Sequence, residues 1–364
     1  MPIIWRYLLR NYLQVFSLCV LSFIAVLFVM RFKDIAEFAA MSSSPASILL
    51  FSLYQIPYIL PDAIPISCVI ASMILFQKMS QNHELIALRA AGFSLKSILF
   101  PLLGAGLVIS LCNFSVISEI APKTKFLSKQ LSHDMTASNP FFIFNKIAEG
   151  KMTNAYVDLK ALRGGQKAKD VVLILNNQTH GRLGVMTAKE LSLEGDNLVG
   201  KDVSIVSSID SKFAENFDHL VIENQVAMTT KASNLSELIK DADWHMGLEY
   251  LPLRMVMAKA ALKNQTVFKD SAGMELARRL SIAIAPVVFT LMGAAFGMEI
   301  GRNKNKKGII YATLLSALYL SCFVAAKSFK HAPIVAWSVY FLPFPIIIAL
   351  SIQALRNVSR GITS

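Results

Sequence analysis

Residues 13–30 read LQVFSLCVLSFIAVLFVM, and this run of the sequence decides the fold class. A membrane-spanning helix needs about 20 predominantly apolar residues. The run contains no charged side chain and polar sequence flanks it, so it predicts a transmembrane helix. Just upstream, Arg6 and Arg10 share one helical face and Trp5 lies nearer the other, which is typical of a helix in the lipid headgroup layer.

Further apolar runs of spanning length follow, and together they predict six transmembrane helices in two groups of three. These runs are residues 46–76, 98–117, 280–300, 308–326 and 332–353. Residues 46–76 are too many for one straight span, and Pro57, Pro61 and Pro65 recur within them. Because proline lacks a backbone N–H and clashes with the preceding turn, we expect a kinked or broken helix there.

The composition supports a membrane protein and excludes several functions. Hydrophobic residues make up 54% of the chain and charged residues 16%, against roughly a quarter charged in soluble domains. The net charge of +12 is more typical of cytoplasmic loops facing anionic lipid than of nucleic-acid binding. The sequence lacks a phosphate-loop motif and His/Cys metal spacing, so we expect no cofactor, no metal and no enzymatic activity of its own.

The polar segment between the two helical groups follows a different pattern. Short alternating stretches are separated by turn-forming sequence, and they lie at residues 156–159, 170–175, 184–188, 203–206 and 219–223. Strands at such spacing predict an all-β domain of the sandwich or jelly-roll kind. Residues 253–262 predict a helix that leads back to the membrane. The expected organisation is a membrane half at 1–118, a β domain with its helical return linker at 119–273, and a second membrane half at 274–364.

Lysine and arginine set the orientation, because cytoplasmic loops carry them in excess. They concentrate at the termini and in the loops 77–97 and 301–307. We therefore expect an inner-membrane protein with both termini in the cytoplasm and the β domain in the periplasm.

The loop 81–92 reads QNHELIALRAAG and predicts a short cytoplasmic helix that Gly92 ends. Glu84 lies in its first turn, where the helix dipole favours an anion. Glu84 and Arg89 are too far apart to form the usual intrahelical pair, so each is free to engage a partner. The alternative is a short connector with solvated charges.

Basic residues flank the predicted spans on the periplasmic side. They are Arg31 and Lys33 after the first span, Lys123, Lys125 and Lys129 after the third, and Arg278 and Arg279 before the fourth. As a set they could form a cationic rim for a phosphorylated lipid. For each residue taken singly, the alternative to binding a lipid substrate is ordinary snorkelling of the side chain to lipid headgroups. Arg278 and Arg279 could instead be structural anchors. Asp62, in the outer half of the second span, fits a carboxylate that faces a watery cavity.

Several segments, in order along the whole chain, resemble the LptF/LptG family of lipopolysaccharide-export permeases. They are RYLLRNYL at 6–13, the proline-rich second span, HELIALRAAGFS at 83–94, EIAP at 119–122 and ELARRLSIAIAP at 275–286. The short N-terminal sequence is more similar to the F-like member. The resemblance implies an ABC-transporter membrane subunit with six spans and a periplasmic jelly roll whose apolar interior receives acyl chains.

The resemblance also implies partners and site residues. The loop helix would be the coupling helix that docks on a cytoplasmic LptB-like ATPase dimer, with Glu84 as acidic anchor, Leu85 and Leu88 as apolar contacts, and Arg89 and Gly92 closing the motif. Arg31 and Lys129 best match the family's lipopolysaccharide contacts. The other implied partners are a paralogous LptF- or LptG-like permease, a single-span LptC-like subunit, an LptA-like periplasmic bridge, and lipopolysaccharide itself.

Two functions of other classes remain open on the sequence. An ion-coupled secondary transporter would use Asp62 as its coupling carboxylate and need no ATPase. A mechanotransmission subunit would couple to an ATPase without carrying lipid.

Overall fold

The computed structural model describes residues 3–41, 45–138, 155–158, 161–163, 167–177, 182–194, 197–209, 219–231, 247–262, 266–298, 307–329 and 332–360. The chain divides into two compact units. One comprises Met1–Phe32, Leu53–Phe126 and Gly247–Ser364, and we call it the helical unit. The other comprises Lys33–Ser52 and Leu127–Met246 and contains the strands, and we call it the β unit.

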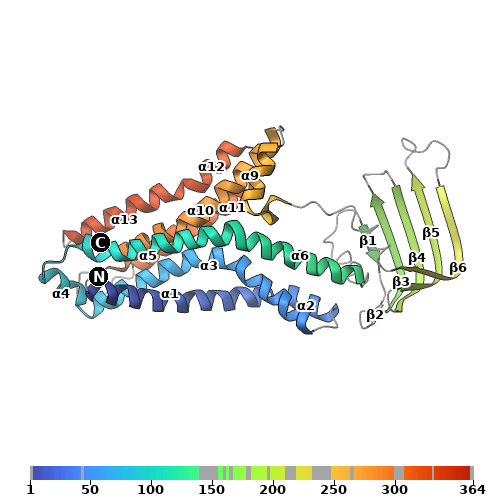
Figure 1. The fold of residues 1–364 in the computed structure, drawn as a ribbon, viewed down its shortest axis with the longest axis horizontal. Helices are drawn as coiled ribbons and strands as arrows, with labels where there is room; N and C mark the ends of the chain where they lie inside the picture. The colour runs from blue at the N-terminus through green and yellow to red at the C-terminus, as the bar shows by residue number, and fades with distance from the viewer. Residues whose placement is uncertain are drawn as a thin grey trace. The chain divides into compact units, whose positions relative to one another are not determined.

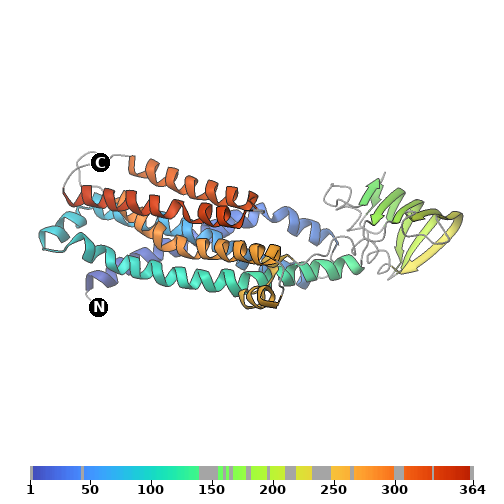
Figure 2. The ribbon, with the colours of Figure 1, turned by 90° about the horizontal axis from the view of Figure 1, so that it is seen from above.

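The helical unit is built from long apolar helices that run side by side along a common direction (Figures 1 and 2). Its elements are α1 (Ile3–Met30), most of α3 (Pro45–Gln81), α4 (Glu84–Ala90), α5 (Leu95–Ser115), a π-helical turn (Val116–Ile120), the start of α6 (Ala121–Ser138), the 3-10 turn η2 (Leu248–Tyr250), α9 (Leu253–Leu262), α10 (Thr266–Gly297), α11 (Lys307–Ser328), α12 (Pro333–Phe341) and α13 (Pro343–Ser359). Within the described residues, 6 helical stretches are long and apolar enough to cross a membrane. The six predicted spans are confirmed, as is the return helix, which is α9.

Helices α3 and α10 form the centre of this unit. In an apolar 18-residue segment of each helix, 72% of the residues are buried, against 6% in the corresponding segment of α1. Their backbones approach closely because α10 presents Gly293 to α3, where a Cβ atom would lie 2.0 Å from Ser72 Oγ and 2.4 Å from the Val69 carbonyl oxygen. Small residues that allow such approach are the usual contact between membrane helices, where apolar burial alone does not favour one contact over lipid.

Helix α3 continues through its three prolines, so of the kinked or broken helix expected there only the break is ruled out. Each proline nevertheless leaves the carbonyl four residues earlier without its usual helical donor. The Asn113 side chain of α5 donates to two such carbonyls, that of Pro61 at 3.4 Å and that of Ile282 at 3.1 Å. These carbonyls lie four residues before Pro65 of α3 and Pro286 of α10, which have no backbone N–H to donate to them. One buried amide thus supplies a donor to one such carbonyl in each of the two central helices.

The β unit contains α2 (Phe32–Met41), the ends of α3 and α6, and an antiparallel sheet. Its strands are β1 (Ala155–Asp158), β2 (Ala161–Arg163), β3 (Lys167–Asn177), β4 (Arg182–Glu194), β5 (Asn197–Ile209) and β6 (His219–Lys231). The order is β1-β3-β4-β5-β6, with β2 also paired to β3, and a register shift falls between Val203 and Ile205. Alternate residues such as Val171 and Leu173 are buried, as expected for a half-buried sheet.

The inserted β domain is therefore confirmed. Among the described strands, β3 to β6 follow one another up and down in a single sheet. A jelly roll needs two sheets joined by crossover connections. The described strands show one sheet without that crossover.

Candidate functional site

Helix α4 is the short helix predicted in the loop 81–92, and Gly92 ends it as expected. Gly92 has a φ of 88°, the left-handed conformation that glycine adopts without strain. The Gly92 amide donates to the Arg89 carbonyl at 3.0 Å, and the Phe93 amide donates to the Leu88 carbonyl at 3.1 Å. This bond pair is the Schellman motif, which satisfies carbonyls that the helix end leaves open.

Both charged residues of α4 hold it to other helices. The Tyr7 hydroxyl of α1 donates to a Glu84 carboxylate oxygen at 3.1 Å. The Arg89 guanidinium donates to the carbonyl oxygens of Val358 at 3.4 Å and Ser359 at 3.0 Å, at the end of α13. These bonds place α4 beside the beginning of the first span and the end of the last, and both termini lie at that end (Figure 1).

The apolar residues of α4 divide between two faces. Leu85 is completely buried in a cluster that includes Leu8 of α1 and Met298 beyond α10, and Leu88 packs against the same cluster. These two leucines anchor α4 to the helical unit. Ile86, by contrast, is 47% exposed, so it is a large apolar side chain of α4 that the helical unit does not bury. The sequence analysis named Leu85 and Leu88 as apolar contacts and did not name Ile86.

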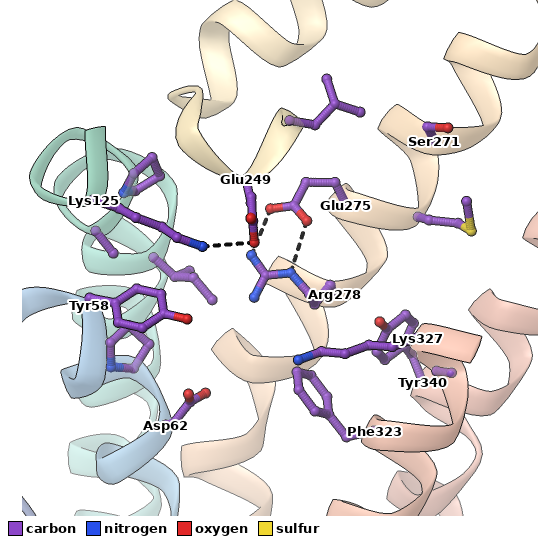
Figure 3. A pocket seen from close by; sticks show the side chains of 17 residues that line it. Tyr58, Asp62, Lys125, Glu249, Ser271, Glu275, Arg278, Phe323, Lys327 and Tyr340 are labelled. Carbon is purple, nitrogen blue, oxygen red and sulfur yellow. Dashed lines mark hydrogen bonds and ion pairs between the residues drawn. The ribbon is translucent and has the colours of Figure 1, made fainter. Parts of the chain in front are cut away.

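The far end of the helical unit contains a cavity of about 410 Å³. Its charged lining residues come from five elements and are Asp62, Lys125, Glu249, Glu275, Arg278 and Lys327. Their side chains converge on one space, with Tyr58 and Tyr340 on either side (Figure 3). The apolar lining includes Ile117, Met274 and Phe323. The sequence-predicted residues Lys125 and Arg278 meet here, whereas Lys327 was not among the predicted site residues.

Arg278 and Arg279 share one carboxylate but have different surroundings. Glu275 accepts from Arg278 Nε at 2.9 Å and Nη2 at 2.7 Å, and from Arg279 Nε at 2.7 Å. Arg278 lines the cavity. Arg279 is fully buried and donates to the backbone carbonyls of Leu248 and Leu251, at 3.3 Å and 2.8 Å. Arg279 is not among the residues that line the cavity, and its hydrogen bonds hold the returning chain at η2.

Lys125 joins three elements at the rim of the cavity. Its ammonium pairs with Glu249 at 2.8 Å and lies over the rings of Tyr58 at 4.9 Å and Tyr250 at 4.7 Å. The Arg31 guanidinium lies 5.4 Å from the Tyr58 ring centroid. Burial raises the pKa of Tyr250, and the Lys125 charge acts in the opposite direction. Tyr58 is thus the shared contact of two cations, each attracted by the negative face of its ring.

The remaining predicted cations lie elsewhere. Lys123 is exposed and pairs with Glu119 at 3.5 Å, one helical turn earlier. Lys33 and Lys129 belong to the β unit, where Lys33 is exposed and Lys129 half-buried.

Asp62 is exposed to the cavity, although its neighbours Pro61 and Ala63 in α3 are buried. The expectation that it faces a cavity is confirmed. No ion pair or hydrogen bond joins Asp62 to another described residue. Arg278 and Lys327 are the cations whose charges act on it. Lys327, at the end of α11, lies 5.2 Å from the Phe323 ring centroid.

Within the part of the chain that the structure describes, no group of three or more His, Cys, Asp or Glu side chains could hold a metal ion. The four cysteines have no disulfide partner.

Comparison with known proteins agrees with this arrangement. A search among curated proteins gave no match. A family model, described as the lipopolysaccharide export system permease LptF/LptG, matches residues 6–357. That match extends over nearly the whole chain and includes α4, every predicted span and the β unit. Because this match covers far more than half of the sequence, the chain belongs to the LptF/LptG family of lipopolysaccharide export system permeases.

Proposed function

We propose that this chain is the membrane subunit of an ABC transporter that extracts lipopolysaccharide from the inner membrane and passes it to a periplasmic bridge protein. ATP would be bound and hydrolysed by a cytoplasmic LptB-like ATPase dimer. A second permease of the same family, a single-span LptC-like subunit and an LptA-like bridge complete the proposed assembly. The termini and α4 would face the cytoplasm, and the β unit the periplasm.

The observation that carries this proposal is the attachment of α4. A short helix with an exposed isoleucine and a carboxylate is hydrogen-bonded to both α1 and α13, and its leucines are buried in the core. A partner that displaces α4 therefore displaces the spans themselves. This attachment suits a subunit whose spanning helices are moved by a cytoplasmic protein bound to α4.

The test is co-purification of the ATPase with full-length variants. Ile86→Asp removes the exposed apolar contact, and Glu84→Ala removes the acidic one. Both should reduce the recovered ATPase about tenfold or more, since a change at an interface hot spot costs about 2 kcal/mol or more and tenfold corresponds to about 1.4 kcal/mol. Lys307→Ala is the control, because Lys307 is exposed at the start of α11. Unchanged recovery with both variants would reject the coupling assignment.

The lipid assignment has its own test. A photocrosslinker at Arg31, which lies where α1 ends beside Tyr58, should capture lipopolysaccharide only when the ATPase is supplied with ATP. Capture that never occurs would favour a mechanotransmission subunit. A tag inserted after Asn177 tests the orientation, because periplasmic protease should reach it in intact cells whose outer membrane is permeabilised.

An ion-coupled secondary transporter is the second candidate, and one observation favours it. Asp62 is a carboxylate within a spanning helix that no described residue pairs with. Intramembrane carboxylates of this kind often bind coupling ions. This candidate predicts lipid transport in vesicles without ATPase, driven by an ion gradient and abolished by Asp62→Asn.

A further inference from the structure

The length of α11 places the cavity at the level of lipid headgroups. Its 22 residues rise about 33 Å, close to the roughly 30 Å of a bilayer's hydrocarbon core. Lys307 and Lys327, at its two ends, therefore lie near opposite membrane surfaces. Asp62 and Arg278 line the same cavity as Lys327, so they share its depth. The apolar residue Phe323, one turn earlier in α11, lies toward the hydrocarbon.

The cavity presents charges of both signs on different walls. Asp62 projects from α3, while Lys327 and Arg278 reach the same space from α11 and α10 (Figure 3). Glu275 is shared by two arginines, so that cluster retains one positive charge. Lys327 contacts the Phe323 ring and makes no ion pair with a described residue. The charges that no described ion pair neutralises are thus the Asp62 carboxylate on one wall and the net positive charge of Lys327 and the arginine cluster on the other.

This pattern defines the chemistry of a complementary ligand. Lys327 and Arg278 require an anionic acceptor, and phosphate oxygens form strong charge-assisted bonds with both side-chain types. Asp62 accepts only, so it requires a hydroxyl or ammonium donor. A phosphodiester with a donor group at its outer end supplies both. Glycerophospholipid headgroups with a glycerol or ethanolamine terminus have this form, whereas choline has no N–H or O–H to donate.

We propose that the cavity binds a glycerophospholipid, with its phosphate between Lys327 and Arg278 and its terminal donor at Asp62. The acyl chains lie along α11, where Leu320 is 45% and Val324 64% exposed next to Phe323. This site belongs to a single chain and needs neither the ATPase nor a second permease. It therefore goes beyond the proposed export of lipopolysaccharide and does not depend on it.

Native mass spectrometry of the delipidated full-length chain tests the site directly. The chain is titrated with phosphatidylglycerol, phosphatidylethanolamine and phosphatidylcholine of equal chain length. We expect the first two to bind about tenfold or more tightly than the third, because only they donate to Asp62. Asp62→Asn should remove most of that difference, and Lys327→Gln should weaken all three about tenfold. Lys307→Gln, at the other end of the same helix, should change nothing.

Several outcomes would overturn the site. Equal binding of the three lipids by the unaltered chain would show that Asp62 contacts no headgroup, and a preference that survives Asp62→Asn would show the same. Lipopolysaccharide that displaces phosphatidylglycerol with the same sensitivity to Lys327→Gln would assign the cavity to the exported lipid. Asp62→Glu, which keeps the carboxylate, should retain the preference, and the melting temperature of each lipid-free variant separates lost binding from lost folding. None of these results bears on ATPase co-purification, so the two proposals fail independently.

Discussion

Replacing Asn113 with leucine should destabilise the helical unit, because two carbonyls would lose their donor inside the membrane. The amide donates to Pro61 at 3.4 Å and Ile282 at 3.1 Å, and Pro65 and Pro286 have no N–H to replace it. Side-chain hydrogen bonds between membrane helices average about 0.6 kcal/mol and reach about 1.7 kcal/mol. Two such bonds give about 1 to 3 kcal/mol. The amide oxygen has no partner among the described residues, so its removal recovers part of that cost and favours the lower half of the range.

The measurement is the free energy of unfolding in mixed micelles with increasing denaturing detergent. Ser351→Ala is the matched control, since the Ser351 hydroxyl is also buried but has no hydrogen-bond partner among the described residues. Its loss should leave stability unchanged or slightly higher. The decisive comparison is Asn113→Leu in a background of Pro65→Ala and Pro286→Ala, where restored backbone N–H groups take over both carbonyls. The cost should then largely disappear, and an equal cost in both backgrounds would refute the role assigned to Asn113.

Three further substitutions test contacts described above by the same unfolding measurement. Gly293→Ala should cost about 2 kcal/mol or more, because its Cβ would lie 2.4 Å from the Val69 carbonyl oxygen, whereas Gly104→Ala meets nothing within 4 Å and should be neutral. Gly92→Ala should cost about 1 kcal/mol through its φ of 88°, and a neutral result would show that α4 ends differently in solution. Arg279→Gln should cost about 3 to 5 kcal/mol, because it leaves buried groups unpaired. The control Lys123→Ala removes an exposed pair and should cost less than about 1 kcal/mol. Equal costs would contradict the anchoring role of Arg279.

The spans and the strands were predictable because each follows from one dominant constraint. Lipid requires apolar length, so residues 13–30 and the other runs could be identified without knowledge of their neighbours. A half-buried sheet requires alternation, which the segment around Val171 shows. The end of α4 was predictable for a local reason, since Gly92 suits the left-handed position that closes a helix.

The site was less predictable because it depends on how each helix is rotated against its neighbours. Adjacent residues on a helix point about 100° apart. Leu85 is therefore buried while Ile86 is exposed, and Arg278 faces the cavity while Arg279 supports the returning chain. Lys327 falls near the end of an apolar run, where snorkelling explains a lysine equally well. Only packing shows that it shares a cavity with Asp62.

The two ends of the helical unit are connected through α10, one of its two most buried helices. At one end of α10, Met298 packs in the same cluster as Leu85 of α4. At the other end, Arg278 lines the cavity and Arg279 holds η2, where the chain returns from the β unit. Between them, Gly293 and the Asn113 amide fix α10 against α3 and α5, so α10 has little freedom to bend or slide. Under the proposed function, a partner that displaces α4 would therefore act on the cavity through a joint movement of packed helices, since densely packed interiors shift between arrangements and do not deform continuously.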